Sequence, residues 1–218
     1  MDFKIVPKPS KKHQLYIIDD TAQLAGIDTL SEAERKFVIT ATGQEQSLIT
    51  INQYNRFLFI YLLKKGKTDW QTNETCRKTG AGLLNVLNRH RLEEITITAL
   101  TGHPKAAVLL AEGLALSAYQ FLKYRSDIKK QAHTLKRICF TRQSVTAKEV
   151  AELEITTEAV YRARTLVNEP LNYLTAEQLA KEIARLGKEA GFKVTTLNKA
   201  RIEKEKMGGI LAVNQGSI

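Results

Sequence analysis

The four histidines are the first residues to consider for metal or acid–base chemistry. His13, His90, His103 and His133 lie in four separate segments of the chain. No two of them have the four-residue spacing that places two imidazoles on one face of a helix, as in many zinc sites. The sequence therefore predicts solvated or singly hydrogen-bonded histidines rather than a metal site built from them.

A glycine-rich stretch, "TGAG" at 79–82, precedes the apolar run "LLNVLNRH". Glycines before a helix can form a turn whose backbone N–H groups hold a phosphate. The stretch has neither the G-x-G-x-x-G nor the Walker pattern, and its glycines equally suit close packing between helices. Both interpretations remain open at the level of sequence.

Neighbouring carboxylates occur as Glu93–Glu94 and Asp19–Asp20, but a chain with 23 acidic residues will contain such pairs by default. General acid–base work needs a cleft around them, so we interpret both pairs as surface charge. The chain has no G-x-S-x-G nucleophile elbow. The sequence therefore predicts no catalytic, metal-binding or substrate-binding residue in these 218 residues.

The composition is typical of a folded protein of the cytoplasm. Hydrophobic residues make up 43% of the 218, which is enough for a sizeable core. The longest apolar runs, such as 106–111, are far shorter than the roughly 20 residues of a membrane-spanning helix, and "MDFKIVPKPSKK" lacks the apolar stretch of a secretory signal. Cys76 and Cys139 are predicted to be buried free thiols in a reducing compartment.

Positive charge is concentrated in the first two thirds of the chain. Of the net charge of +10, residues 1–145 contribute 22 Lys and Arg against 13 Asp and Glu, whereas 146–218 contribute 11 against 10. The most basic run is "KYRSDIKKQAHTLKR" at 123–137. We favour a solvated helix exit there over a nucleic-acid patch, because aromatic residues that could stack on bases are not interleaved through it.

Hydrophobic periodicity predicts alternating strands and helices. The strands are rich in β-branched and aromatic residues, and the short polar "NQYN" suggests a hairpin between the third and the fourth. This order is typical of an α/β fold. Strands are expected at 3–6, 14–19, 47–52, 56–63, 94–98 and 137–140, and helices at 31–41, 72–89 and 104–122.

The helix expected at 104–122 is apolar nearly all round, so it should be buried against the sheet. Pro104 suits the first helical position, where its missing N–H is harmless. Gly113 in the helix interior costs on the order of 1 kcal/mol relative to alanine, which predicts a close backbone contact at that point.

From residue 146 the pattern is one long helix that must end before Pro170. Thr175 is a good N-cap, with Gln178 in the capping-box position, and the helix that follows should end at Gly191. A strand at 192–197 and a short helix at 199–207 come next. We interpret this order as the start of a second α/β unit that is too short to close a sheet, and we expect the chain to be the truncated part of a larger protein.

Three stretches together resemble the leucine aminopeptidase, or cytosol aminopeptidase, family of two-metal exopeptidases. They are "AEGLALSAYQFLKYRSD" (111–127), "YRARTLVNEPLNYLTAEQLAKEI" (161–183) and "MGGILAVNQGS" (207–217), and Ala176 stands where the family usually has proline. The match is looser before about residue 75. The positions that carry the resemblance, expected to be structural, are Glu112, Gly113, Asn168, Pro170, Asn172, Thr175, Gly208, Gly209 and Gly216.

The resemblance implies an α/β fold with a macro-domain-like mixed sheet flanked by helices at 1–145, a linker helix at 146–170, and the truncated start of a catalytic α/β domain at 171–218. It also implies a peptide-hydrolysing enzyme with two divalent ions, zinc or manganese. The family's metal ligands and catalytic arginine would come after Ile218, so this chain alone is expected to hold no metal and to be inactive.

The resemblance further implies a homohexamer that the first domain helps to assemble, and DNA binding in some members. For the basic first domain, solubility is the alternative to DNA binding. Two other functions stay open: a free-standing macro-like module that binds a nucleotide or ADP-ribose near Gly80, and a basic DNA-binding protein without enzymatic activity. No membrane partner is expected.

Overall fold

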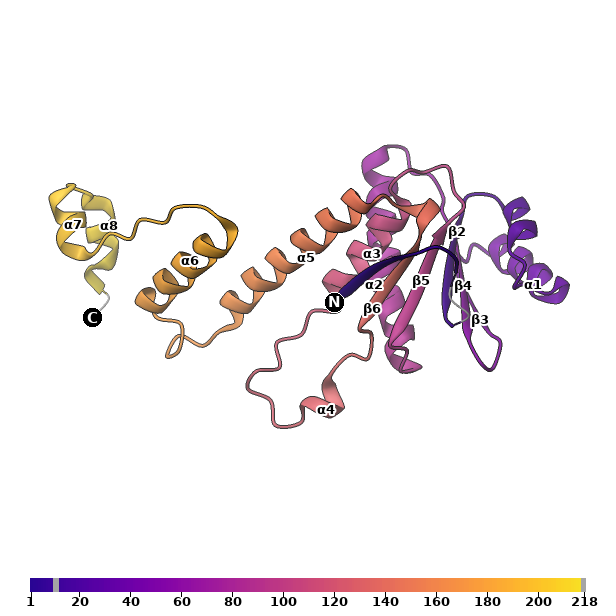
Figure 1. Cartoon of the computed structure of the whole chain (residues 1–218), viewed down its shortest axis with the longest axis horizontal. Coiled ribbons are helices and arrows are strands. Elements are labelled where there is room, and N and C mark those ends of the chain that lie inside the picture. The colour runs from indigo at the N-terminus through magenta and orange to yellow at the C-terminus, as the bar shows by residue number, and fades with distance from the viewer. Residues whose placement is uncertain (10–11, 217–218) are drawn as a thin grey trace. The chain divides into compact units, whose positions relative to one another are not determined.

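A computed structural model of the chain describes residues 1–9 and 12–216. Residues 2–141 form a six-stranded sheet with the strand order β1-β6-β5-β2-β4-β3 (Figure 1). Among the strand pairs of the described residues, only β3–β4 is antiparallel, and it forms the hairpin predicted around "NQYN". The strands are β1 (Asp2–Val6), β2 (Gln14–Ile18), β3 (Leu48–Asn52), β4 (Phe57–Leu62), β5 (Glu94–Ala99) and β6 (Arg137–Thr141).

Both faces of this sheet are covered, and strand alternation divides the core in two. Along β2, Leu15 and Ile17 belong to one buried cluster, whereas Tyr16 and Ile18 belong to the other. Successive side chains of a strand point to opposite faces, which explains why a central strand is apolar throughout. The α/β architecture predicted from the sequence is confirmed.

Helices and 3-10 turns complete the fold. The first cluster includes residues of α2, α3 and α5, and the second includes residues of η1 and α1; Figure 1 shows α1 and the α2–α3 pair on opposite sides of the sheet. The helices are η1 (Thr21–Gly26), α1 (Glu32–Gly43), α2 (Asp69–Arg89), α3 (Ala106–Ser117), α4 (Ile128–Gln131), η2 (Arg142–Ser144), α5 (Ala147–Asn168), α6 (Ala176–Ala190), α7 (Lys199–Lys204), α8 (Gly208–Val213) and η3 (Asn214–Gly216).

Side-chain caps set where several helices begin. Ser31 and Glu34 form a reciprocal capping box at α1. Thr146 and Glu149 do the same at α5, where the Thr146 N–H donates to Glu149 at 2.8 Å and the Glu149 N–H donates to Thr146 Oγ1 at 3.2 Å. Each cap satisfies N–H groups that have no partner inside the helix.

The helix expected at 104–122 is shorter at both ends. The helix α3 begins at Ala106 after Lys105, so Pro104 lies outside it, and it ends at Ser117. The prediction that Phe121 and Leu122 are helical was therefore wrong. Apolar character continues past the end of the helix, so periodicity alone did not locate the end.

The chain divides into two compact units, Met1–Ala163 and Arg164–Ile218. The described part of the second unit has helices joined by turns and irregular segments, and residues 192–198 have no regular secondary structure, so the strand predicted at 192–197 is wrong. A strand needs a partner for its backbone N–H and C=O groups, and no other segment within 164–216 pairs with this one. Within the described residues, none of the helices is both long and apolar enough to cross a bilayer.

Candidate functional site

The residues that carry the resemblance begin at the crossing of α2 and α3. A Cβ atom added at Gly113 would lie 2.0 Å from the Arg77 carbonyl oxygen, and one added at Gly80 would lie 2.0 Å from the Leu110 carbonyl oxygen. Each glycine thus lets its helix touch the backbone of the other. The close contact predicted at Gly113 is confirmed.

This crossing also decides between the two interpretations of "TGAG". Residues 79–82 lie in the middle of α2, so the phosphate-holding turn at a helix start is wrong. Gly80 is buried against Leu110, and its backbone N–H belongs to the helix. The alternative function, a module that binds a nucleotide or ADP-ribose near Gly80, required a turn at this position, and no such turn is present.

Glu112 adds an ion pair to the same crossing. Its carboxylate accepts a hydrogen bond from Arg77 Nε at 2.8 Å, and the side chains are 22% and 36% exposed respectively. Arg77 therefore meets Glu112 through its side chain and Gly113 through its backbone carbonyl. The pair fixes the relative rotation of the two helices more than it stabilises them, because partly exposed pairs contribute little.

The second group of residues forms the turn between α5 and α6. The helix α5 ends at Asn168, and the Pro170 carbonyl then accepts hydrogen bonds from the N–H groups of Tyr173 and Leu174, both at 2.9 Å. Asn172 lies exposed within this turn. The predicted end of the helix before Pro170 is confirmed.

Thr175 caps α6 as predicted. Its hydroxyl accepts a hydrogen bond from the Gln178 N–H at 3.3 Å. At the other end, Gly191 has a φ of 78°, the left-handed conformation that favours glycine at a helix terminus. The sequence therefore predicts both ends of this helix correctly.

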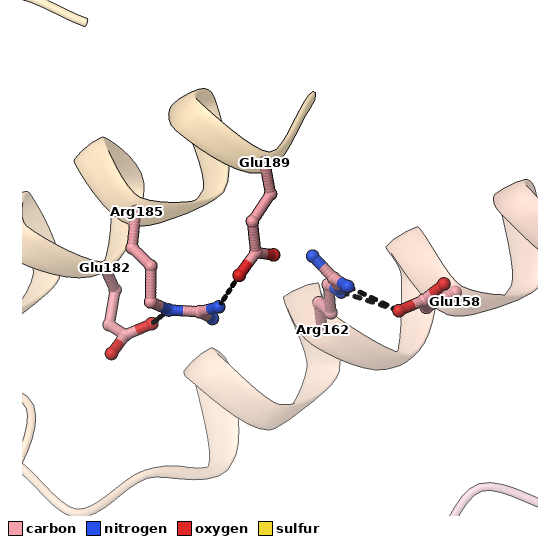
Figure 2. Close-up of polar contacts among 5 residues, drawn as sticks. All are labelled: Glu158, Arg162, Glu182, Arg185 and Glu189. Carbon is pink, nitrogen blue, oxygen red and sulfur yellow. Dashed lines mark hydrogen bonds and ion pairs between the residues drawn. The ribbon is translucent and has the colours of Figure 1, made fainter. Parts of the chain in front are cut away.

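The polar faces of α5 and α6 carry ion pairs along each helix (Figure 2). On α5, Arg162 pairs with Glu158 one turn earlier. On α6, Arg185 donates to Glu182 at 2.9 Å and also pairs with Glu189. Such pairs are worth roughly 0.2–0.5 kcal/mol each, so they support the helices and do not by themselves form a site.

The third group lies in the last described residues. Gly208 and Gly209 begin α8, Gly216 ends η3, and a Cβ atom at any of the three would meet nothing within 4 Å. None of these glycines has a positive φ. Local structure therefore does not explain why glycine occupies these positions, and Ser217 of this stretch lies outside the described residues.

One of the two adjacent carboxylate pairs is more than surface charge. Asp19 accepts hydrogen bonds from the Gly102 N–H at 3.0 Å, the Thr101 hydroxyl at 3.0 Å and the Gln23 amide at 2.7 Å. The Gly102 hydrogen bond is the main reason that the pKa of Asp19 is lowered. Asp19 therefore connects the loop after β2 with the loop after β5 through hydrogen bonds. The sequence had indicated only surface charge at this position.

The other pair is engaged in ion pairs between strands. Glu93 pairs with Lys136 at 2.9 Å, which lowers the pKa of Glu93. Glu94 pairs with Arg137 at 2.9 Å, and Arg137 also pairs with Asp2 at 2.8 Å. These contacts connect β1, β5 and β6 where those strands begin.

Two of the histidines, His13 and His90, contact the same residue, Phe57. His13 Nδ1 accepts a hydrogen bond from the Phe57 N–H at 3.1 Å, and the His90 ring packs on Phe57 with ring centres 4.3 Å apart. Residues 1–9 and 12–216 contain no group of three or more His, Cys, Asp or Glu side chains placed to hold a metal ion. Cys76 and Cys139 are both free and buried, and burial raises the pKa of each thiol.

Sequence comparison places the last part of the chain in a known domain. Residues 161–218 match the model of the cytosol aminopeptidase family, catalytic domain. A "Probable cytosol aminopeptidase" of Clostridium perfringens is 31% identical over 167 residues, which is 72% of this chain and 34% of the relative. One from Exiguobacterium sibiricum is 31% identical over 192 residues, 87% of this chain and 39% of the relative.

Solved structures share the fold. A mutant of tomato leucine aminopeptidase matches with a TM-score of 0.75 at 15% identity, over 100% of this chain and 48% of the other. The bottromycin maturation enzyme BotP matches with a TM-score of 0.69 at 19% identity, over 95% and 44%. The chain thus spans well under half the length of the curated relatives reported above.

Proposed function

Because this chain belongs to the cytosol aminopeptidase family, we propose that it is the N-terminal region of a metal-dependent, leucyl-type aminopeptidase that removes amino-terminal residues from peptides. The observation that carries the proposal is the 31% identity to a relative over 72% of the chain. The match to the family's catalytic domain from residue 161 agrees with it.

Within this protein we assign residues 1–145 to an N-terminal α/β domain, 146–170 to a linker helix and 171–218 to the start of the catalytic domain. The second unit supports this assignment, because among its described residues only Gly187 is buried. Apolar side chains such as Leu171 and Val213 are 84% and 88% exposed. A region with so little buried surface does not have a core of its own, which suits a part of a larger domain.

We propose that the metal centre implied by the family is not formed by these 218 residues. The described residues include no cluster of three or more candidate ligands. We therefore place the two divalent ions, zinc or manganese, in polypeptide outside this chain, and expect the chain alone to be inactive. One matching structure is of BotP in complex with Mn, which agrees with divalent metals among relatives.

A chimaera tests the function directly. Residues 1–218 would replace the corresponding region of the Clostridium perfringens relative, and release of leucine from leucine amide would be measured with and without Mn²⁺. We expect metal-dependent hydrolysis by the chimaera and none by the 218-residue chain. A folded, metal-loaded chimaera without activity would contradict the proposed family role, and chelator-sensitive hydrolysis by the chain alone would contradict its inactivity.

The assembly proposed for the whole protein is a homohexamer in the cytoplasm, and DNA binding by the basic first domain stays open beside solubility. Residues 123–131, which include Lys129 and Lys130, are exposed, as both a solvated segment and a DNA-binding surface would be. Light scattering of the chimaera measures the assembly. Filter binding to duplex DNA at several salt concentrations tests the partner, since a phosphate-binding surface gives a steep salt dependence.

A further inference from the structure

The strand β3 (Leu48–Asn52) forms an edge of the sheet that no other described strand covers. It pairs with β4 alone, and the strand order places β1 at the opposite edge (Figure 1). An open edge presents backbone N–H and C=O groups to other chains, and proteins usually protect such edges with charged residues or proline. The strand β1 carries Asp2 and Lys4, whereas β3 reads LITIN and has neither a charged residue nor a proline.

The register of the β3–β4 hairpin shows which backbone groups of β3 point outward. The Leu62 N–H donates to the Ser47 carbonyl oxygen at 2.8 Å, and the Gln53 N–H donates to the Arg56 carbonyl oxygen at 2.9 Å. Both contacts use an odd-numbered residue at an end of β3. Because hydrogen-bonded and non-hydrogen-bonded positions alternate along an antiparallel pair, the odd-numbered residues of β3 bond to β4 and the even-numbered ones do not.

The even-numbered residues are Leu48, Thr50 and Asn52, and their backbone N–H and C=O groups therefore point away from β4. Among the described residues, no strand lies beyond β3 to bond with them. The pattern is symmetric about Thr50, which is exposed. A second β3 that runs in the opposite direction thus fits with Thr50 opposite Thr50, and each of the three residues then exchanges N–H to C=O hydrogen bonds with the other copy.

Charge at the two ends of β3 favours the same arrangement. Glu45 precedes the strand and is exposed, and Arg56 follows the strand and is partly exposed. When two copies pair antiparallel about Thr50, position 45 lies across from position 55, so Glu45 of each copy comes next to Arg56 of the other. Opposite charges across a strand pair stabilise it, whereas like charges directly opposite destabilise it.

We propose that the β3 edge binds a second copy of this chain by antiparallel pairing about a two-fold axis at Thr50. Both copies use the same edge, so the contact closes at a dimer. One five-residue strand per copy is a small contact, so the dimer is weak and depends on concentration. The proposal rests on residues 1–163 alone and is independent of the aminopeptidase activity and of the homohexamer proposed for the whole protein.

Sedimentation equilibrium of the complete 218-residue chain, from about 10 µM to about 1 mM at constant salt, measures the association. Thr50→Lys and Thr50→Glu each place two like charges opposite one another across the two-fold axis, so each should weaken dimerisation about fivefold or more. An equimolar mixture of the two variants should associate again, because the opposed charges then differ in sign. Thr75→Lys, at an exposed threonine of α2 outside the sheet, is the matched control and should dimerise as the unchanged chain does.

Amide hydrogen exchange tests the register. As the protein concentration rises, exchange should slow at the amides of Leu48, Thr50 and Asn52 and stay unchanged at those of Ile49 and Ile51, which already bond to β4. A chain that stays monomeric up to about 1 mM, or association that Thr50→Lys does not weaken, would overturn the proposal. Association without slower exchange at the three even-numbered amides would place the contact elsewhere, and growing assemblies that protect β1 amides as well would indicate pairing of β3 with β1; either result also contradicts it.

Discussion

At the scale of single residues, the close crossing of α2 and α3 depends on two glycines, which have no side chain at the point of contact. Gly80 and Gly113 each lie against a carbonyl of the opposite helix, and backbone cannot move aside as the end of a flexible side chain can. Gly82 lies two residues from Gly80 in the same helix, yet a Cβ there would meet nothing within 4 Å. The chain therefore contains its own matched control.

We predict that Gly113→Ala destabilises the protein by roughly 1–3 kcal/mol or more, since the added methyl group forces the helices apart. Gly82→Ala should instead be neutral or stabilise by up to about 1 kcal/mol through helix propensity. Urea unfolding followed by circular dichroism measures both variants. If Gly113→Ala and Gly82→Ala have the same free energy of unfolding, the close contact between the helices at Gly113 is contradicted.

A second residue-scale prediction concerns His13. Burial, and then the charge of Lys12, lower the pKa of His13 below the ordinary histidine value of 6.5, and its Nδ1 must be unprotonated to accept the Phe57 N–H. The unfolded chain therefore binds the proton more readily than the folded one. His13 should stabilise the fold above about pH 6.5 and lose that contribution as the pH falls through the lowered pKa.

The urea midpoint measured between pH 7.5 and 5 tests this sign. His13→Asn offers a side-chain oxygen as acceptor without a group that titrates in this range, so its midpoint should vary less with pH than that of the unchanged protein. Identical pH dependence of the two proteins would remove His13 as the cause.

At the scale of elements, Thr175 controls the start of α6. Thr175→Ala removes the hydroxyl that accepts the Gln178 N–H, and loss of such a cap costs about 1 kcal/mol. We expect faster amide hydrogen exchange in the first turns of α6. Thr196→Ala, in the exposed segment after Gly191, is the control and should leave exchange unchanged.

Some element boundaries were predictable because a local chemical signal marks them. Thr175, Pro170 and Gly191 each act through their own backbone or side chain, so sequence was sufficient there. The end of α3 and the absence of a strand at 192–197 had no such signal. Both depend on what packs against the segment, which periodicity does not report.

At the scale of the whole molecule, the two compact units differ in how well they bury apolar side chains. All buried hydrophobic residues belong to residues 1–163 among those that the structure describes. The second unit instead exposes large apolar side chains, namely Val167, Leu171, Tyr173, Leu179, Ile183, Phe192, Met207, Ile210 and Val213.

We predict that limited proteolysis of the 218-residue chain cuts within 164–216 before it cuts within 1–163. Segments with few buried contacts open at lower free energy, and cleavage follows the open population. Mass spectrometry of early fragments identifies the sites. First cuts inside the sheet, or uniform resistance of the second unit, would show that the second unit has a stable core.

The sequence by itself determined the α/β order of elements, the end of α5 before Pro170, both ends of α6 and the family resemblance, because each depends on the types and spacing of nearby residues. Tertiary structure decided the rest. Only packing shows that Gly80 faces a carbonyl rather than a phosphate, that Asp19 ties two loops, and that β3 lies at an uncovered edge of the sheet. These features arise between residues distant in sequence, and no local pattern encodes which distant groups will meet.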